Sequence, residues 1–208
     1  MKQLPTALLL VWAIPLTAQV PDEGTLNIRR EGREVGTETF RVTASDSGFR
    51  ITTRTVYAGT RPPTELATTL ERSGPGGNLG FQLEYAGAAP GARLYAVQQG
   101  NRLTVRRVER NGEHASEAPA PRGLVLLADS VFALFLQLAV SATDRPVPVV
   151  QVQGPLRLSL SVSRILSNGG TRIVWNGGLE GELLLGPHGE LLLVSLPALG
   201  LEAVRREE

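Results

Sequence analysis

The sequence predicts an all-β fold, mainly antiparallel, that encloses a single helix. The first observation is the frequency of glycine and proline, 23 and 14 of the 208 residues, which provides many positions for turns. The second is that apolar and polar residues alternate with a period of two between these turns, as in strands with one buried face. The third is one long apolar run, residues 123–142, flanked by such segments on both sides.

The predicted strands follow from this alternation. In the clearest example, Leu79, Phe81, Leu83 and Tyr85 alternate with polar residues or glycine. Glycine pairs and Asn–Gly dipeptides separate several neighbouring strands and favour tight hairpins. We expect about eleven or twelve strands, over residues 24–31, 34–44, 49–57, 65–72, 79–85, 93–99, 102–110, 147–153, 156–165, 171–176, 179–185 and 190–196, with 124–127 and 199–205 as additional candidates.

Irregularities are expected at three places before the apolar run. The inward-facing series of the second strand changes parity, which predicts a bulge near Gly36. In the strand 102–110, strict alternation would point Arg107 inward, and burying an unpaired guanidinium costs several kcal/mol. A bulge at residues 106–107 is therefore preferred. Residues 111–122 are polar and rich in proline, which predicts an irregular connection across the surface.

The apolar run is the only convincing helix candidate. Asp129 is placed to cap a helix over about residues 129–141. Apolar side chains then cover most of its circumference, so the helix must be buried on nearly all sides; they are Val131, Phe132, Leu134, Phe135, Leu136 and Leu138. A curled sheet or incomplete β-barrel with this helix in its concavity fits the pattern best, and a two-sheet sandwich is the alternative.

The first residues have the layout of a signal peptide. Lys2 precedes an apolar core at residues 7–16, and small residues lead to an expected cleavage site after Ala18. The core is shorter than the roughly 20 residues that span a bilayer, and an uncleaved anchor is the alternative. We therefore expect a signal peptide at residues 1–18, one β-rich domain at 19–208, no transmembrane segment after cleavage, and a periplasmic or secreted location.

The charge balance excludes several classes of partner. Without Lys2, the 21 basic residues fall to 20, which balance 20 acidic ones, so the mature chain has no electrostatic tendency to bind nucleic acid or an anionic membrane. The chain has no cysteine, which excludes a lipid-modified cysteine and disulfides.

Catalytic and metal-binding motifs are not evident. His114 falls in the polar connection and His188 in a turn, without a neighbouring cluster of ligands for a metal. No serine lies in a nucleophile elbow, and no glycine pair lies between a strand and a helix followed by lysine. We expect no enzymatic activity, no metal and no cofactor.

Candidate ligand contacts are aromatic or basic. Phe81, Tyr85, Phe132, Phe135 and Trp175 could line an apolar cavity, and ordinary core packing is the alternative reading. The arginine-rich strand 102–110 could form a patch for anionic ligands, or simply the solvated face of a sheet. Asp129 could be a buried functional carboxylate instead of a cap.

Three segments resemble a family of exported, largely uncharacterised bacterial all-β proteins: REVGTETFRV (33–42), LLADSVFALFLQLA (126–139) and GELLLGPHGELLLVSLPALGLEAVRR (181–206). The layout is also similar to the periplasmic lipoprotein-carrier superfamily of LolA and LolB. That resemblance implies a curved antiparallel sheet whose concave, apolar side is plugged by helices. The lipid-anchored members need a cysteine that this chain lacks.

Together these observations predict a soluble exported envelope protein that binds an apolar or lipid-like ligand between the curved sheet and the helix. The alternative is a non-enzymatic protein-binding or scaffolding module of the cell envelope. Such a module would dock through a sheet edge or through residues 191–194.

Overall fold

The computed structural model describes residues 21–45, 48–59, 64–74, 77–86, 92–141, 145–154, 157–167 and 169–207. Over these residues, fifteen strands form one sheet. The elements in chain order are β1 (Asp22–Arg30), β2 (Arg33–Ser45), β3 (Gly48–Tyr57), β4 (Thr64–Arg72), β5 (Leu79–Ala86), β6 (Arg93–Gln99), β7 (Arg102–Glu109), β8 (Gly112–Pro119), β9 (Val125–Leu127), the 3₁₀ turn η1 (Ala133–Phe135), α1 (Leu136–Ser141), β10 (Val147–Gln151), β11 (Arg157–Ser167), β12 (Gly170–Asn176), β13 (Gly181–Leu185), β14 (Leu191–Leu196), η2 (Pro197–Leu199) and β15 (Leu201–Arg205). The predicted signal peptide lies outside the described residues.

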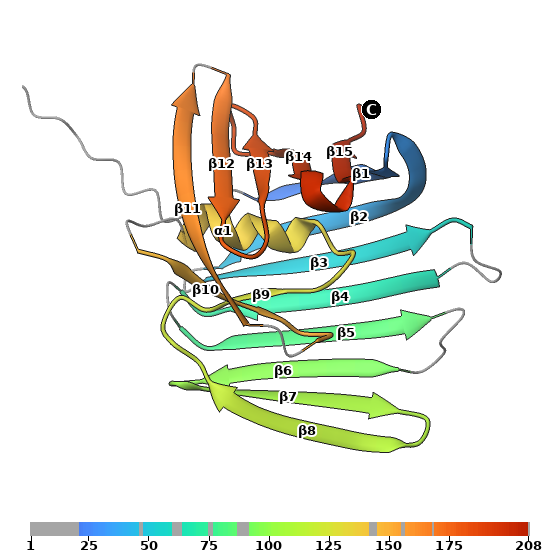
Figure 1. Ribbon diagram of the computed structural model, residues 1–208, viewed down its shortest axis with the longest axis vertical. Coiled ribbons are helices and arrows are strands. Elements are labelled where there is room, and N and C mark those ends of the chain that lie inside the picture. Colours follow the sequence, from blue (N-terminus) through green and yellow to red (C-terminus); the bar gives the residue numbers. More distant parts are fainter. Residues whose placement is uncertain are drawn as a thin grey trace, which may run out of the picture.

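The sheet is curled and open, and its middle is formed by β1 and β15, the first and last of the described strands. Its strand order is β8-β7-β6-β5-β4-β3-β2-β1-β15-β14-β13-β12-β11-β10-β9. Neighbouring strands are antiparallel except for the parallel pair β9 and β10. Figure 1 shows β1–β8 as one broad layer, with α1, β9 and β10 in front of it. The predicted all-β class and the curled sheet around an internal helix are confirmed.

Three strands exceed the expected twelve: β9 and β15 fall on the additional candidates 124–127 and 199–205, and β8 forms where an irregular connection was expected over residues 111–122. Gly112–Pro119 pairs along its whole length with β7 and forms β8, one edge of the sheet. Nearly all of β8 is exposed, so its polar composition is that of an edge strand and not of a loop. Two glutamates and a terminal proline make this edge a poor template for pairing with other chains.

One predicted bulge is confirmed and the other is wrong. The register of β1 and β2 shifts where Ile28 faces Gly36 and Arg29 faces Glu34, which leaves one extra residue beside Gly36. By contrast, β6 and β7 pair regularly from Arg93 to Gln99. Arg107 therefore stays on the inner face of β7, where it lies beyond the covered part of the core and keeps its guanidinium exposed.

The interior of the curled sheet is filled by a segment that we call the plug, residues 124–138. It consists of β9, a turn at Asp129 and Ser130, η1 and the start of α1. Apart from the two turn residues, every side chain of the plug is at most 4% exposed. The helix is shorter than the expected span 129–141, because residues before Ala133 turn instead of coiling. No helix among the described residues is long and apolar enough to cross a membrane.

The prediction that Asp129 caps the helix is wrong. Asp129 is exposed, and its carboxylate accepts a hydrogen bond from the Gln151 side chain at 3.3 Å. The helix N-terminus is instead capped from the sheet by Glu38 of β2. The Glu38 carboxylate accepts the backbone N–H groups of Phe132 (2.9 Å) and Ala133 (2.7 Å). These are two of the donors that a helix leaves without an internal partner.

Glu38 is completely buried, and the Thr55 hydroxyl also donates to it, at 3.0 Å. Desolvation disfavours the ionised carboxylate and raises the pKa of Glu38 from 4.5 to about 7, although the three donated hydrogen bonds act in the opposite direction. Close by, the Tyr57 hydroxyl donates to the carbonyl oxygen of Ser130 at 2.9 Å, and burial raises the pKa of Tyr57 to about 12. Glu38 of β2 therefore fixes the start of the helix, and Tyr57 of β3 fixes the turn that precedes it.

The outer edge of β9 is satisfied by side chains in place of another strand. The buried Gln137 amide accepts the Leu126 N–H at 3.4 Å and donates to the Leu126 carbonyl at 2.6 Å. Arg72 of β4 donates to the Leu124 carbonyl and, at 3.3 Å, to Gln137. Burial lowers the pKa of Arg72 to about 10, which leaves it charged at neutral pH. Because buried backbone groups need partners, these two side chains allow the sheet to end inside the core.

The Glu38 cap predicts a pH dependence of stability. Its folded pKa lies above its unfolded value, so its contribution to stability is full below about pH 4.5 and is lost as pH rises through about 7. We expect the difference in free energy of unfolding between wild type and Glu38→Gln to change by roughly 3 kcal/mol across this window. Urea denaturation between pH 4.5 and 8 measures it. The exposed Glu34→Gln on the same strand is the control, and equal pH profiles for wild type and Glu38→Gln would contradict the assignment.

The edge of β9 gives a second prediction. Gln137→Leu leaves the buried Leu126 N–H and carbonyl without partners, and we expect it to lower the free energy of unfolding by about 2–4 kcal/mol. Exchange of the Leu126 amide hydrogen should accelerate at the same time. The exposed Gln82→Leu on β5 is the matched control, with an expected change within about 0.5 kcal/mol. A loss no larger for Gln137→Leu than for this control would show that the amide is dispensable.

Candidate functional site

The first candidate site is a hollow at the seam where the sheet does not close. β8 pairs only with β7, and β9 pairs only with β10 within the described residues. Between the inner faces of β7 and β8 and the end of β10 lies a hollow of about 560 Å³, the seam hollow. It is lined by Leu103, Val105, Arg107, Glu109, His114, Ala115, Ser116, Glu117, Ala118, Val150, Gln151, Val152, Gln153 and Arg157.

The floor of the seam hollow is apolar because strand alternation places small and aliphatic side chains there. Leu103 and Val105 face inward from β7, and Ala118 lies opposite Leu103 in register on β8. Val150 and Val152 approach from the β10 side and are 7% and 4% exposed. A strip of aliphatic surface therefore continues from the core of the protein to the open seam.

The rim of the seam hollow is polar. Arg107 lies opposite His114 in register, and both face the hollow. The Arg107 guanidinium donates to the Gln153 carbonyl, and its Nε lies 3.7 Å from a Glu109 carboxylate oxygen. Arg157 opens β11 directly opposite Val150. Basic, amide and imidazole groups thus surround one end of an apolar strip.

Gln153 orders this rim through the backbone of the plug. Its amide oxygen accepts the Asp129 N–H at 2.7 Å, and its amide nitrogen donates to the Asp129 carbonyl at 3.1 Å. Arg107 of β7 donates to the backbone of Gln153. A continuous series of hydrogen bonds therefore links the turn of the plug, the end of β10 and β7. The shape of the seam hollow is coupled in this way to the position of the plug.

The arginine-rich strand divides between two roles. On the outer face of β7, Arg102 pairs with Glu117 of β8, and Arg106 pairs with Glu113 at 2.6 Å. These two arginines form the solvated face that the sequence offered as one alternative. Arg107 alone among these three points to the seam hollow, because regular alternation separates it from its neighbour.

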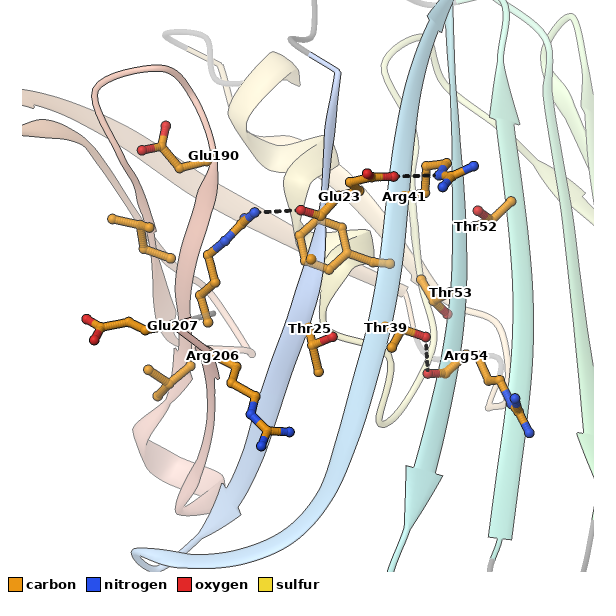
Figure 2. Close-up of a pocket in the computed structure, with 15 residues that line it drawn as sticks. Glu23, Thr25, Thr39, Arg41, Thr52, Thr53, Arg54, Glu190, Arg206 and Glu207 are labelled. Atoms are coloured by element: carbon orange, nitrogen blue, oxygen red, sulfur yellow. Dashed lines mark hydrogen bonds and ion pairs between the residues drawn. The ribbon is translucent and has the colours of Figure 1, made fainter.

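A second concavity, the outer groove, lies on the opposite, solvent-facing side of β15, β1, β2 and β3 and has a volume of about 1060 Å³. Figure 2 shows the side chains of Thr25, Thr39 and Thr52 lining it between charged groups. Arg41 pairs with Glu23 at 2.8 Å, and other charges on this side are paired likewise, Arg54 with Glu65 at 2.7 Å and Arg205 with Asp22 at 3.0 Å. The groove is open, and most of its charge is neutralised internally.

Most of the predicted ligand-contact residues lie in the packed core. Phe81, Phe132, Phe135 and Trp175 are at most 4% exposed, and none of them lines the seam hollow or the outer groove. Phe135 stacks on Trp175, with ring centroids 5.2 Å apart, so the structure brings this pair together. Tyr85 is separate and lines a smaller hollow of about 180 Å³ with Arg107 among others.

The structure also shows where the two histidines and the predicted docking segment, residues 191–194, lie. His114 lies on the rim of the seam hollow, and His188 lies in the exposed turn before Glu190. Among the described residues, no three His, Asp or Glu side chains are grouped closely enough to hold a metal ion. In the segment 191–194, Leu191 and Val194 are fully buried, whereas Leu192 and Leu193 are half-buried and Leu192 lines the outer groove.

Sequence reasoning missed the side chains that hold the plug, although their positions carried a signal. Glu38 has the same parity along its strand as Phe40 and Val42, and Arg72 the same parity as Leu70. Gln137 is the only amide within the apolar run. A polar residue at an inward position of an otherwise apolar series indicates a specific buried partner.

Comparison with known proteins identifies the fold but no family. No protein-family model and no curated protein matches the sequence. A solved structure described as a β-barrel-like protein of the domain of unknown function DUF1849, from Brucella abortus, is similar, with a TM-score of 0.56 and 8% sequence identity. The match covers 91% of this chain and 97% of that one. At this identity the likeness shows a shared β-barrel-like fold alone, and the resemblance to LolA and LolB stays a prediction.

Proposed function

We propose that the protein is an exported, non-enzymatic binding protein that holds an apolar or lipid-like ligand in the seam hollow. The observation that carries this proposal is an aliphatic strip, formed by Leu103, Val105, Val150 and Val152, that reaches the open edge of the sheet. The hollow of about 560 Å³ is within the usual size range of small-molecule sites. The location differs from the space between sheet and helix that the sequence suggested, because the plug occupies that space.

An extended acyl chain matches this site better than a compact ligand. The strip runs along the inner face of β7, beside the edge strand β8 and the end of β10, and the hollow above it is open on one side, so a chain could lie there without displacing the plug. Burial of each CH₂ group contributes about 0.8 kcal/mol, so a chain of several such groups would bind measurably even on a partly open floor.

Lipid extraction followed by mass spectrometry, on protein purified from its own host, tests the proposal. We expect an apolar ligand in the wild-type protein, and binding of decan-1-ol by the emptied protein in calorimetry. Val105→Asp places a charge on the floor and should weaken decan-1-ol binding at least tenfold.

The control is Val97→Asp, at an exposed valine of β6 that lies outside the seam hollow, which should bind decan-1-ol like wild type. Wild-type protein that is consistently empty and does not bind the alcohol would refute the proposal. Equal binding by the two aspartate variants would place the ligand elsewhere.

A second candidate function, a protein-binding module of the envelope, is favoured by one observation. Ile165 and Leu166, near the end of the β11–β12 hairpin, are 49% and 72% exposed. They point to opposite faces of β11, so each face of the hairpin presents an exposed apolar side chain. A photo-crosslinking residue at position 166 should capture a reproducible envelope protein that the same residue at exposed position 202 does not capture. Identical patterns from the two positions would exclude this hairpin as a docking site.

A further inference from the structure

The rim of the seam hollow contains the feature that defines the ligand further. Most exposed arginines of the sheet are neutralised across strands, as Arg106 is by Glu113 at 2.6 Å and Arg54 by Glu65 at 2.7 Å. The Arg157 side chain, in contrast, has no hydrogen bond or ion pair with any described residue, and it lines the seam hollow. An arginine left without a carboxylate beside an apolar floor is available for a ligand.

Arg107 is the second available guanidinium. One of its five donors is used by the Gln153 carbonyl, and its Nε forms an exposed ion pair with Glu109 at 3.7 Å, which is longer than a hydrogen bond. The remaining donors are free to bind a ligand, because the side chain is 44% exposed at the mouth of the hollow.

The net charge of this rim is positive. Arg107 and Arg157 carry two positive charges, and Glu109 contributes one negative charge. Glu117 also borders the hollow, but its carboxylate pairs with Arg102 on the outer face of the sheet. His114, opposite Arg107 in register, adds an imidazole N–H donor to the same rim.

We propose that the seam hollow selects an anionic amphiphile, an alkyl chain that carries one phosphate or carboxylate headgroup. The inference rests on the proposed function, since it requires the chain to lie on the floor of Leu103, Val105 and Val150. The headgroup then lies between Arg107 and Arg157. Guanidinium groups bind phosphate and carboxylate through paired N–H donors, which gives these headgroups an advantage over a hydroxyl.

Titration calorimetry with decyl phosphate, decanoate and decan-1-ol, all below their aggregation concentrations, separates the two parts of the site. We expect the two anions to bind at least tenfold more tightly than the alcohol. Arg157→Gln and Arg107→Gln should each weaken decyl phosphate binding about tenfold and leave decan-1-ol binding unchanged. Arg106→Gln, which removes the same charge from the opposite face of β7, is the matched control and should bind all three probes like wild type.

The possible outcomes are distinguishable. Equal binding of the anions and the alcohol would overturn the headgroup proposal and leave the apolar site intact. Failure of all three probes to bind would overturn the proposed function with it. Inorganic phosphate is the fourth probe, and binding as tight as that of decyl phosphate would show an anion site that does not use the floor. Arg157 is exposed at the start of its strand, so Arg157→Gln tests the proposal even if Arg107→Gln disturbs β7.

Discussion

The carboxylate of Glu38 fixes the start of the internal helix against β2, and the placement of the plug depends on this contact. A short helix of this kind has little stability of its own. It persists because the sheet supplies the acceptor for its first N–H groups and an apolar enclosure for its side chains. Tyr57, Arg72 and Gln137 extend the same principle to the turn and to β9. The sheet therefore curls around the plug and also holds it by hydrogen bonds from buried side chains.

A plug that fills the interior changes where a ligand can bind. In a closed barrel a ligand usually occupies the lumen. Here the lumen is packed with the chain's own residues, and the seam hollow lies outside it over a floor of largely buried aliphatic side chains. The exposed, charged β8 edge protects this opening from pairing with other chains. The seam is thus a stable opening in the fold and not an unfinished sheet.

Much of this architecture could be predicted from the sequence. Period-two alternation identified most of the strands, and the bulge at Gly36 followed from a change of parity. β8 was not predicted, because an edge strand that is exposed to solvent on both faces shows no alternation of apolar and polar residues. The bulge predicted at residues 106–107 is wrong for a different reason. Arg107 faces inward, but it lies at the opening of the seam hollow, where its guanidinium stays exposed and no cost of burial arises.

The candidate site was harder to predict than the fold. Large aromatic residues are candidates for the lining of a cavity, but large apolar side chains are also the ones most often buried in a core. The lining that the structure shows is made of valines, a leucine and arginines from strands far apart in the sequence. Their meeting depends on how far the sheet curls, and no local pattern encodes that angle. Glu38 and Gln137 were detectable only as polar exceptions to apolar series.

The pairing of β1 with β15 has a consequence for how the molecule forms. The middle of the sheet contains the first and last of the described strands, which are 183 residues apart at the contact between Asp22 and Arg205. During synthesis, β1 can have only β2 as a neighbour until the final strand has emerged. The two parts of the sheet, β1–β8 and β9–β14, therefore cannot be joined before β15 has been synthesised. A protein with this strand order completes its sheet only when β15 takes its place between β1 and β14.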